Sequence, residues 1–265
     1  MDGLMARPLR ATTPSPQTTR GKTTPSTSNG VFDTQFNSTA NPRTTINVAA
    51  AAVNLFYLVN LMHDISYQYG FTEQAGNFQT RQLWQGRERS IPNRSGGLDN
   101  GIAIHEYVHG ISLRLTGGPT ASGCLDTKEA RGLSEGWSDA IAMIVLARSS
   151  DTATTSIPMG AMGISPLGVY WSLVTKYGFS TNLYDAKQSE GNIVTMQIII
   201  GGMMLQPCNP TFLSARDAII SADKLHYNGA HKCEIYKGFG NRGLGLGATR
   251  IRIDDFSIPP ECERR

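Results

Sequence analysis

Apolar side chains recur every three or four residues along most of this sequence, which is the spacing of an α-helix with one buried side. From 46 to 69, an alanine run leads into large aliphatic residues, and Gly70 ends the pattern. Further helices are predicted at 99–115, 134–148, 168–179, 192–205, 209–227 and 231–245. The weak strand signal lies before residue 99, so the pattern predicts a helix-dominated α+β fold.

The two ends of the chain differ in character from its middle. Residues 1–45 are rich in Thr, Ser, Pro and Asn, with few large apolar side chains, so we expect a disordered or extended arm. Residues 46–250 would form one domain, and 251–265 would be a tail. Within the domain, 71–98 are polar and glycine-rich and would be loop or short strands.

The most apolar stretches of the sequence are 48–62 and 193–205. Both are shorter than the roughly 18 uninterrupted apolar residues that a membrane-spanning helix needs, so we interpret them as buried core elements. The residues after Met1 contain no apolar run of the kind found in a signal peptide. The sequence by itself therefore predicts no membrane partner.

The composition is that of a globular protein, because 40% of the 265 residues are hydrophobic and 17% are charged. The net charge is only +3, and the basic residues are scattered along the chain. We therefore expect no nucleic-acid partner, and we expect a monomer.

Four cysteines occur, at positions 124, 208, 233 and 262, and none forms a CxxC pair. A bridge between Cys208 and Cys233 would enclose one helical stretch, but the cysteines could equally be buried free thiols. The sequence leaves both possibilities open.

The strongest chemical signal is HEYVH at 105–109. Residues four apart lie on one side of a helix, so His105 and His109 can bind the same metal ion. Glu106 lies beside them, where its carboxylate could reach a metal-bound water and act as a general base. The alternative is an ordinary helix with two incidental histidines.

A catalytic zinc ion needs three protein ligands and one open position. The segment SEGWSDA at 134–140 offers Glu135 as the third ligand, and Asp139, one turn later, as a carboxylate that holds a ligand histidine. The same acids would also suit a capped surface helix. In a third alternative, Cys124 would be a fourth ligand of a closed, structural zinc site that could not hydrolyse a substrate.

These motifs, together with NLFYLVNLMHDISYQYGF at 54–71 and RGLGLGA at 242–248, resemble those of the fungalysins. Fungalysins are secreted fungal zinc metalloendopeptidases with a thermolysin-like fold. The resemblance implies an extracellular enzyme that hydrolyses proteins or peptides and is made with a leader and an inhibitory propeptide. The zinc helix would lie between an N-terminal mixed part and a C-terminal helical part at 168–245.

Carried over by position, the resemblance implies a role for each residue of the two motifs. His105, His109 and Glu135 would bind one zinc ion per chain. Glu106 would be the general base, and Asp139 would orient His105.

The sequence departs from the fungalysin pattern in two shortened segments and at one residue. After AGNFQT, only 81–97 replace a long segment that includes a substrate-binding edge strand. Between 162 and 168, a segment is missing whose histidine steadies the oxyanion, and no histidine of this chain lies between 110 and 225. In GLSEGW, Ser134 stands where the fungalysins have glycine.

Two classes of function follow from these observations. The chain is either a zinc endopeptidase or an internally shortened relative that keeps the zinc site and lacks a competent substrate groove. The other histidines receive no catalytic role: His226 and His231 are expected to be exposed at helix ends, and His63 to make a structural hydrogen bond.

Overall fold

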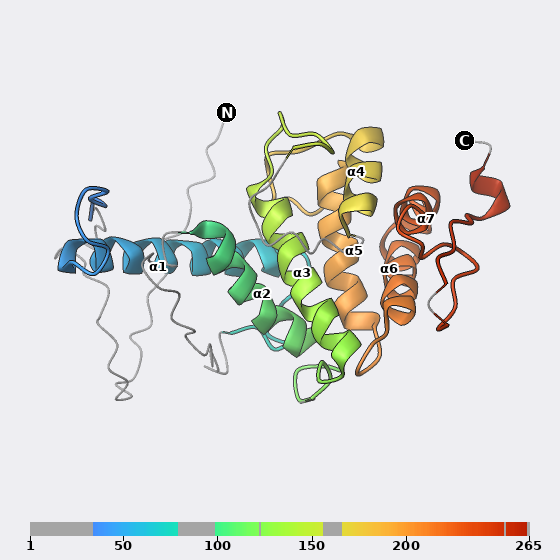
Figure 1. Cartoon of the computed structure of the whole chain (residues 1–265), viewed down its shortest axis with the longest axis horizontal. Coiled ribbons are helices and arrows are strands. Elements are labelled where there is room, and N and C mark those ends of the chain that lie inside the picture. Colours follow the sequence, from blue (N-terminus) through green and yellow to red (C-terminus); the bar gives the residue numbers. More distant parts are fainter. Residues whose placement is uncertain (1–33, 79–98, 122, 156–165, 252, 264–265) are drawn as a thin grey trace.

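The computed structural model describes residues 34–78, 99–121, 123–155, 166–251 and 253–263, and these residues are mainly helical (Figure 1). The helices are α1 (Thr45–Gln68), α2 (Asn100–Leu115), α3 (Lys128–Leu146), α4 (Pro166–Tyr177), α5 (Gly191–Leu205), α6 (Phe212–Tyr227), α7 (Lys232–Gly240) and the 3-10 helix Pro260–Cys262. The helix-dominated prediction is confirmed. The strand part of the α+β prediction is not, because the β pairing within the described residues is an isolated bridge between Leu244 and Asp255.

The largest difference between a predicted and an observed boundary is at the start of α3. The helix begins at Lys128 rather than near 134, because the side chain of Thr127 caps it by accepting a hydrogen bond from the Ala130 amide (3.3 Å). The first turn and a half is polar, so the apolar spacing used for the prediction gave no signal there. At the other end of the chain, α7 stops at Gly240, and Gly243 adopts a positive φ of 77° in the turn that follows.

The expected arm falls mostly outside the described residues, since only 34–44 of it are described. This part forms turns that lead directly into α1. The buried side chain of Asn47 holds it, since its Oδ1 accepts from the Asn37 amide (2.8 Å) and its Nδ2 donates to the Asn37 carbonyl (2.9 Å). The predicted loop or strands at 71–98 are described only as far as Phe78, where the chain forms turns.

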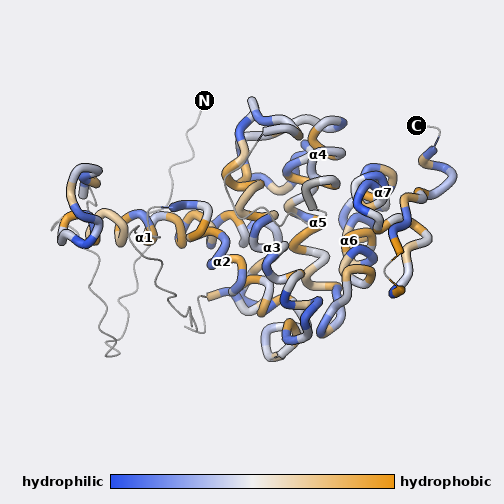
Figure 2. The backbone as a smooth tube through the Cα atoms, viewed as in Figure 1, coloured by the Kyte–Doolittle hydropathy of each residue, from blue (hydrophilic) through white to orange (hydrophobic). Residues whose placement is uncertain are grey.

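The central element of the core is α5, which is buried along almost its whole length. It packs closely against α6, because a Cβ atom at Gly202 would come within 2.8 Å of the Ile219 side chain. Figure 2 shows hydrophobic residues along α5 between its neighbours. A helix that is apolar on all sides is typical of a core element, so the interpretation of 193–205 holds.

The first helix differs from that interpretation. α1 has 24 residues, and only 28% of its most apolar stretch of 18 residues is buried. By length and composition alone, α1 is long and apolar enough to cross a membrane, as some core helices of soluble proteins also are. The prediction that no segment reaches this length is therefore wrong. Asn54 and Asn60 interrupt the apolar run without lowering its mean enough. One side contributes Leu58 and Met62 to the core, and Figure 1 shows the N-terminal part of α1 extending away from the other helices.

The cysteines form two disulfides, Cys124–Cys208 and Cys233–Cys262, so neither the Cys208–Cys233 bridge nor the free thiols occur. The first bridge joins the loop before α3 to the loop after α5. Asn209 supports it, because its amide donates to the Cys124 carbonyl (2.8 Å). The pairing depends on how α3 and α5 pack, which spacing along the chain does not reveal.

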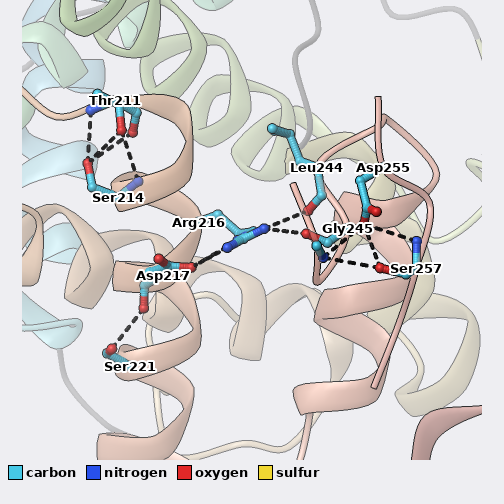
Figure 3. A network of polar contacts seen from close by, with 10 residues as sticks. Thr211, Ser214, Arg216, Asp217, Ser221, Leu244, Gly245, Asp255 and Ser257 are labelled. Atoms are coloured by element: carbon cyan, nitrogen blue, oxygen red, sulfur yellow. Dashed lines mark hydrogen bonds and ion pairs between the residues drawn. The ribbon is translucent and has the colours of Figure 1, made fainter. Parts of the chain in front are cut away.

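The segment after α7 is held against α6 by one buried cation (Figure 3). Arg216 donates through Nη1 to the carbonyl oxygens of Leu244 (3.2 Å) and Gly245. On the other side of this turn, Asp255 accepts from the hydroxyl of Ser257 (2.6 Å). The amides of Gly245 and Leu246 donate to the carbonyl oxygens of Asp255 and Ser257 (2.7 Å each), and together with the disulfide at Cys262 these bonds tie the predicted tail to the helical body.

One histidine contradicts its prediction. His231 is buried, since its Nδ1 lies 2.7 Å from Oδ1 of Asp223 and its amide donates to Oδ2 (3.1 Å). The rings of Tyr177 and Tyr227 lie nearly perpendicular to its ring, at centroid distances of 4.9 and 4.8 Å. The left-handed Asn228 reverses the chain after α6 and brings His231 back onto Asp223.

The other two histidines without a predicted catalytic role agree with their predictions. His226 is exposed as expected. His63 lies half-buried near the end of α1, with Nδ1 3.1 Å from Oδ1 of Asp64.

Removing the disulfides should destabilise the fold, and the loss should grow with the logarithm of the length of the loop that each closes. The Cys124–Cys208 bridge spans 84 residues and Cys233–Cys262 spans 29. Replacing either pair by serine should lower the free energy of unfolding by about 2 to 5 kcal/mol, and the longer loop should cost about 1 kcal/mol more. Urea titration of the two double variants would measure this, and equal or reversed losses would contradict it.

Substituting His231 should leave a buried carboxylate without its partner. We expect His231→Ala to lower the free energy of unfolding by about 3 kcal/mol, because Asp223 would stay buried and lose its ring contact. His226→Ala, an exposed histidine from the same region, is the matched control and should cost less than about 1 kcal/mol. Similar losses in the two variants would show that the buried pair does not stabilise the fold.

Candidate metal centre

The candidate site lies where α2 and α3 pack against each other (Figure 1). Ile104, Val108 and Ile111 of α2 are fully buried in the core that these helices share with α1, α4, α5 and α6. The start of α2 is fixed by Asp99, whose Oδ1 accepts from the Gly101 amide (3.0 Å). Because the apolar sides are fixed in the core, the polar residues at the edge of each helix are brought to one place.

A second contact fixes α2 close to its histidines. Phe78 packs directly on Gly110, where a Cβ atom would come within 2.6 Å of the ring. The same ring meets Tyr107 edge-on at 4.9 Å, and the guanidinium of Arg114 lies over it at 4.5 Å from the centroid. The turn after α1 is therefore clamped onto α2 beside His109.

The structure brings His105, His109 and Glu135 together, with one donor atom from each within 4.8 Å of the others. His105 Nε2 lies 3.0 Å from His109 Nε2 and 3.2 Å from Glu135 Oε2, and His109 Nε2 lies 3.4 Å from that oxygen. Ligands about 2.05 Å from a tetrahedral zinc ion are about 3.3 Å apart, so these separations suit a shared metal ion.

The far nitrogen of each histidine has its own partner. Asp139 Oδ1 lies 2.8 Å from His105 Nδ1, and Ser134 Oγ lies 3.0 Å from His109 Nδ1. A carboxylate only accepts, so Nδ1 of His105 carries the proton of this contact, and in the neutral ring the lone pair is then on Nε2. This is the atom that faces His109 and Glu135, so the ring is oriented for a shared metal ion.

The protonation of His109 also suits metal binding. Burial lowers the pKa of His109 below its ordinary value, although the nearby Glu135 carboxylate raises it in part. His105 lowers the pKa further, since a second positive charge so close is unfavourable. Metal ions bind the neutral imidazole, so a lowered pKa widens the pH range in which the ligand is available.

The centre is open on its solvent side. The side chain of Glu135 is 64% exposed, and Glu106, on α2 next to His105, is exposed as well. Cys124 is held in a disulfide, so it is not a fourth ligand and the closed structural site is excluded. Three protein donors and an open side are typical of catalytic rather than structural zinc sites.

Two parts of the expected site lie outside the described residues, namely 79–98, where the edge strand would be shortened, and 156–165, near the missing histidine segment. The sequence did not reveal the contact of Ser134 with His109. Ser134 was visible only as a departure from the fungalysin pattern beside Glu135. Its neighbour on α2 depends on how the two helices pack.

Comparison with known proteins decides the family. The model of the fungalysin metallopeptidase family, M36, matches residues 8–90, 83–165 and 167–248. The chain belongs to the fungalysin family. It is 34% identical to extracellular metalloproteinase MEP of Pyricularia oryzae over 321 aligned residues, which cover 89% of this chain and 50% of that protein.

Two further relatives are similar at the same level. The extracellular metalloproteinase MEP of Leptosphaeria maculans is 33% identical, over 79% of this chain and 46% of its own length. The Aspergillus niger extracellular metalloproteinase mep is 34% identical, over 80% of this chain and 46% of its own length. This fungalysin chain therefore spans about half the length of the curated relatives it matches.

The comparisons also bear on the shortened segments. The alignment with the Pyricularia oryzae protein runs over 321 positions, more than the 265 residues of this chain, so parts of that relative have no counterpart here. The family match is broken at 83–90 and again after 165. These are the places where the fungalysin pattern is interrupted in the sequence. The family implies a metal ion, typically zinc, and the donor set fits one.

Metal analysis would test the centre directly. We expect the purified chain to bind one Zn²⁺, and Glu135→Gln to weaken binding by more than about 100-fold, because a neutral amide replaces a charged ligand. Glu73→Gln, an exposed glutamate in the turn after α1, is the matched control. Competition with a chromophoric chelator gives both dissociation constants, and equal values would show that Glu135 is not a ligand.

Proposed function

We propose that this chain is a secreted zinc-dependent metalloendopeptidase that hydrolyses peptide bonds in proteins or peptides. The observation that carries the proposal is the convergence of His105, His109 and Glu135 on an open side of the α2–α3 pair, beside Glu106. Family membership supports the reaction class, because the relatives are named extracellular metalloproteinases.

In this proposal the zinc ligands are His105, His109 and Glu135, and Asp139 holds His105 through Nδ1. Zinc bound there would polarise a carbonyl group and lower the pKa of a bound water to about 7. Each ring is held through its Nδ1, by Asp139 in His105 and by Ser134 in His109, so that both Nε2 atoms face the metal position. A ligand set that is already in place loses less entropy when the ion and the substrate bind.

Glu106 is the general base in this proposal. Its exposed carboxylate, next to His105 on α2, accepts a proton from the attacking water and donates it to the nitrogen of the departing amine. Its exposure leaves it free to meet a substrate, and its negative charge is felt by His109. No other acid of the described α2 helix could take this role, because Glu106 is its single carboxylate.

An extracellular location fits the cysteine chemistry. Both disulfides persist in oxidising compartments and are rare in the cytosol. The remaining family features belong to the same proposal: a thermolysin-like arrangement, a catalytic domain over 46–250, a monomeric state and an inhibitory propeptide as partner.

A second candidate is an internally shortened relative that keeps the metal centre without a competent substrate groove. The broken family match at 83–90 and after 165 favours it. So does the exposed apolar surface of α1, where Phe56, Tyr57 and Val59 are 46%, 63% and 44% exposed. Loss of an oxyanion donor alone would cost a factor of about 10² to 10³ in rate.

Cleavage of a quenched casein substrate separates the two candidates. The endopeptidase should cleave it in a chelator-sensitive manner, and Glu106→Gln should lower the rate by about 10² to 10⁴ while zinc remains bound, because only the proton acceptor is lost. Glu73→Gln should cleave at the unchanged rate. A folded, zinc-loaded chain without cleavage would instead establish the shortened relative.

A further inference from the structure

The serine that precedes Glu135 is placed to act on the metal centre without touching a metal ion. Ser134 is 8% exposed, and its Oγ lies 3.0 Å from Nδ1 of His109. The other ligand histidine, His105, has a carboxylate in the equivalent place. The two histidines of the HEYVH motif (HExxH, where x is any residue) are therefore held by different kinds of group, a carboxylate and a hydroxyl.

The hydroxyl groups of Ser112 and Ser134 favour one direction for the hydrogen bond between Ser134 and His109. Ser112 donates its hydroxyl proton to the His109 carbonyl oxygen (3.1 Å) on its own helix. Its Oγ is then free to accept from the hydroxyl of Ser134, 3.4 Å away. A hydroxyl has one proton and two lone pairs, so Ser134 Oγ can donate to Ser112 and still accept a hydrogen bond from the Nδ1–H group of His109.

This assignment determines the tautomer of His109. With its proton on Nδ1, the ring carries a lone pair on Nε2, the atom that faces His105 and Glu135. In the other tautomer the proton would point into the donor set and block it. A proton on Nε2 would also leave Nδ1 to accept from Ser134, and Ser134 could then no longer donate to Ser112.

We propose that Ser134 is a positioning residue that holds His109 in its metal-binding tautomer. The inference rests on the proposed function, since it takes His109 as a ligand.

The test compares Ser134→Ala with Ser138→Ala. Ser138 is buried one turn further along α3, and its hydroxyl has no hydrogen-bond partner among the described residues, so the control removes the same atom from the same helix. Alanine favours a helix, so both variants should fold. Ser134→Thr keeps the hydroxyl and should restore the properties of the unaltered chain.

Two readouts are independent of peptidase activity. Competition with a chromophoric chelator should show zinc binding weakened about 10- to 100-fold in Ser134→Ala and unchanged in Ser138→Ala. In the metal-free chain, long-range ¹H–¹⁵N spectra should show the Nδ1-protonated tautomer of His109, and a mixture of tautomers in Ser134→Ala.

Failure of this inference and failure of the proposed function give different results. The role of Ser134 would be overturned if Ser134→Ala bound zinc within about two-fold of the unaltered chain and kept the same His109 tautomer. If zinc binding still required Glu135, the metal centre itself would remain supported. Equal weakening in Ser138→Ala would overturn it too, because the loss would then reflect the helix. A chain that binds no zinc at all would refute the proposed function itself.

Discussion

The packing of α2 against α3 is the contact on which the candidate centre depends. Neither helix carries a complete donor set, since α2 supplies two imidazoles and α3 supplies the carboxylate. The helical repeat places His105 and His109 on one side, but only the buried apolar surfaces on both helices bring Glu135 opposite them. A loss of core packing would therefore separate the ligands before it changed any of them.

The arrangement that suits a metal ion also gathers polar groups at one edge of the core. Two imidazole Nε2 atoms and a carboxylate oxygen lie 3.0 to 3.4 Å apart, and both imidazoles are partly removed from water. The packed apolar sides of the two helices hold these groups in place. A metal ion bound by all three would link α2 to α3, so metal binding would also stabilise the fold.

Sequence alone predicted the parts of this protein that depend on local periodicity. The seven main helices and the HExxH motif follow from spacings of three and four residues, and each occurs in the structure close to its expected position. The contact between Ser134 and His109, the pairing of the cysteines and the burial of His231 were not predictable. Each depends on how elements far apart in the sequence pack together, and a helical repeat does not encode that. The exposed side of α1 was missed for the same reason, because an apolar pattern shows that a surface tends to be covered and not what covers it.

The neutral character of Ser134 also has an electrostatic consequence. Three carboxylates already surround the donor set, at Glu106, Glu135 and Asp139, and a divalent cation would offset only two of their charges. A second acidic partner, on His109, would raise the net negative charge and disfavour the approach of a carbonyl oxygen that becomes negative during hydrolysis. A hydroxyl can accept a hydrogen bond from the Nδ1–H group without adding charge. Orientation of the ring and the charge of the centre are thereby controlled separately, which a carboxylate at position 134 would not allow.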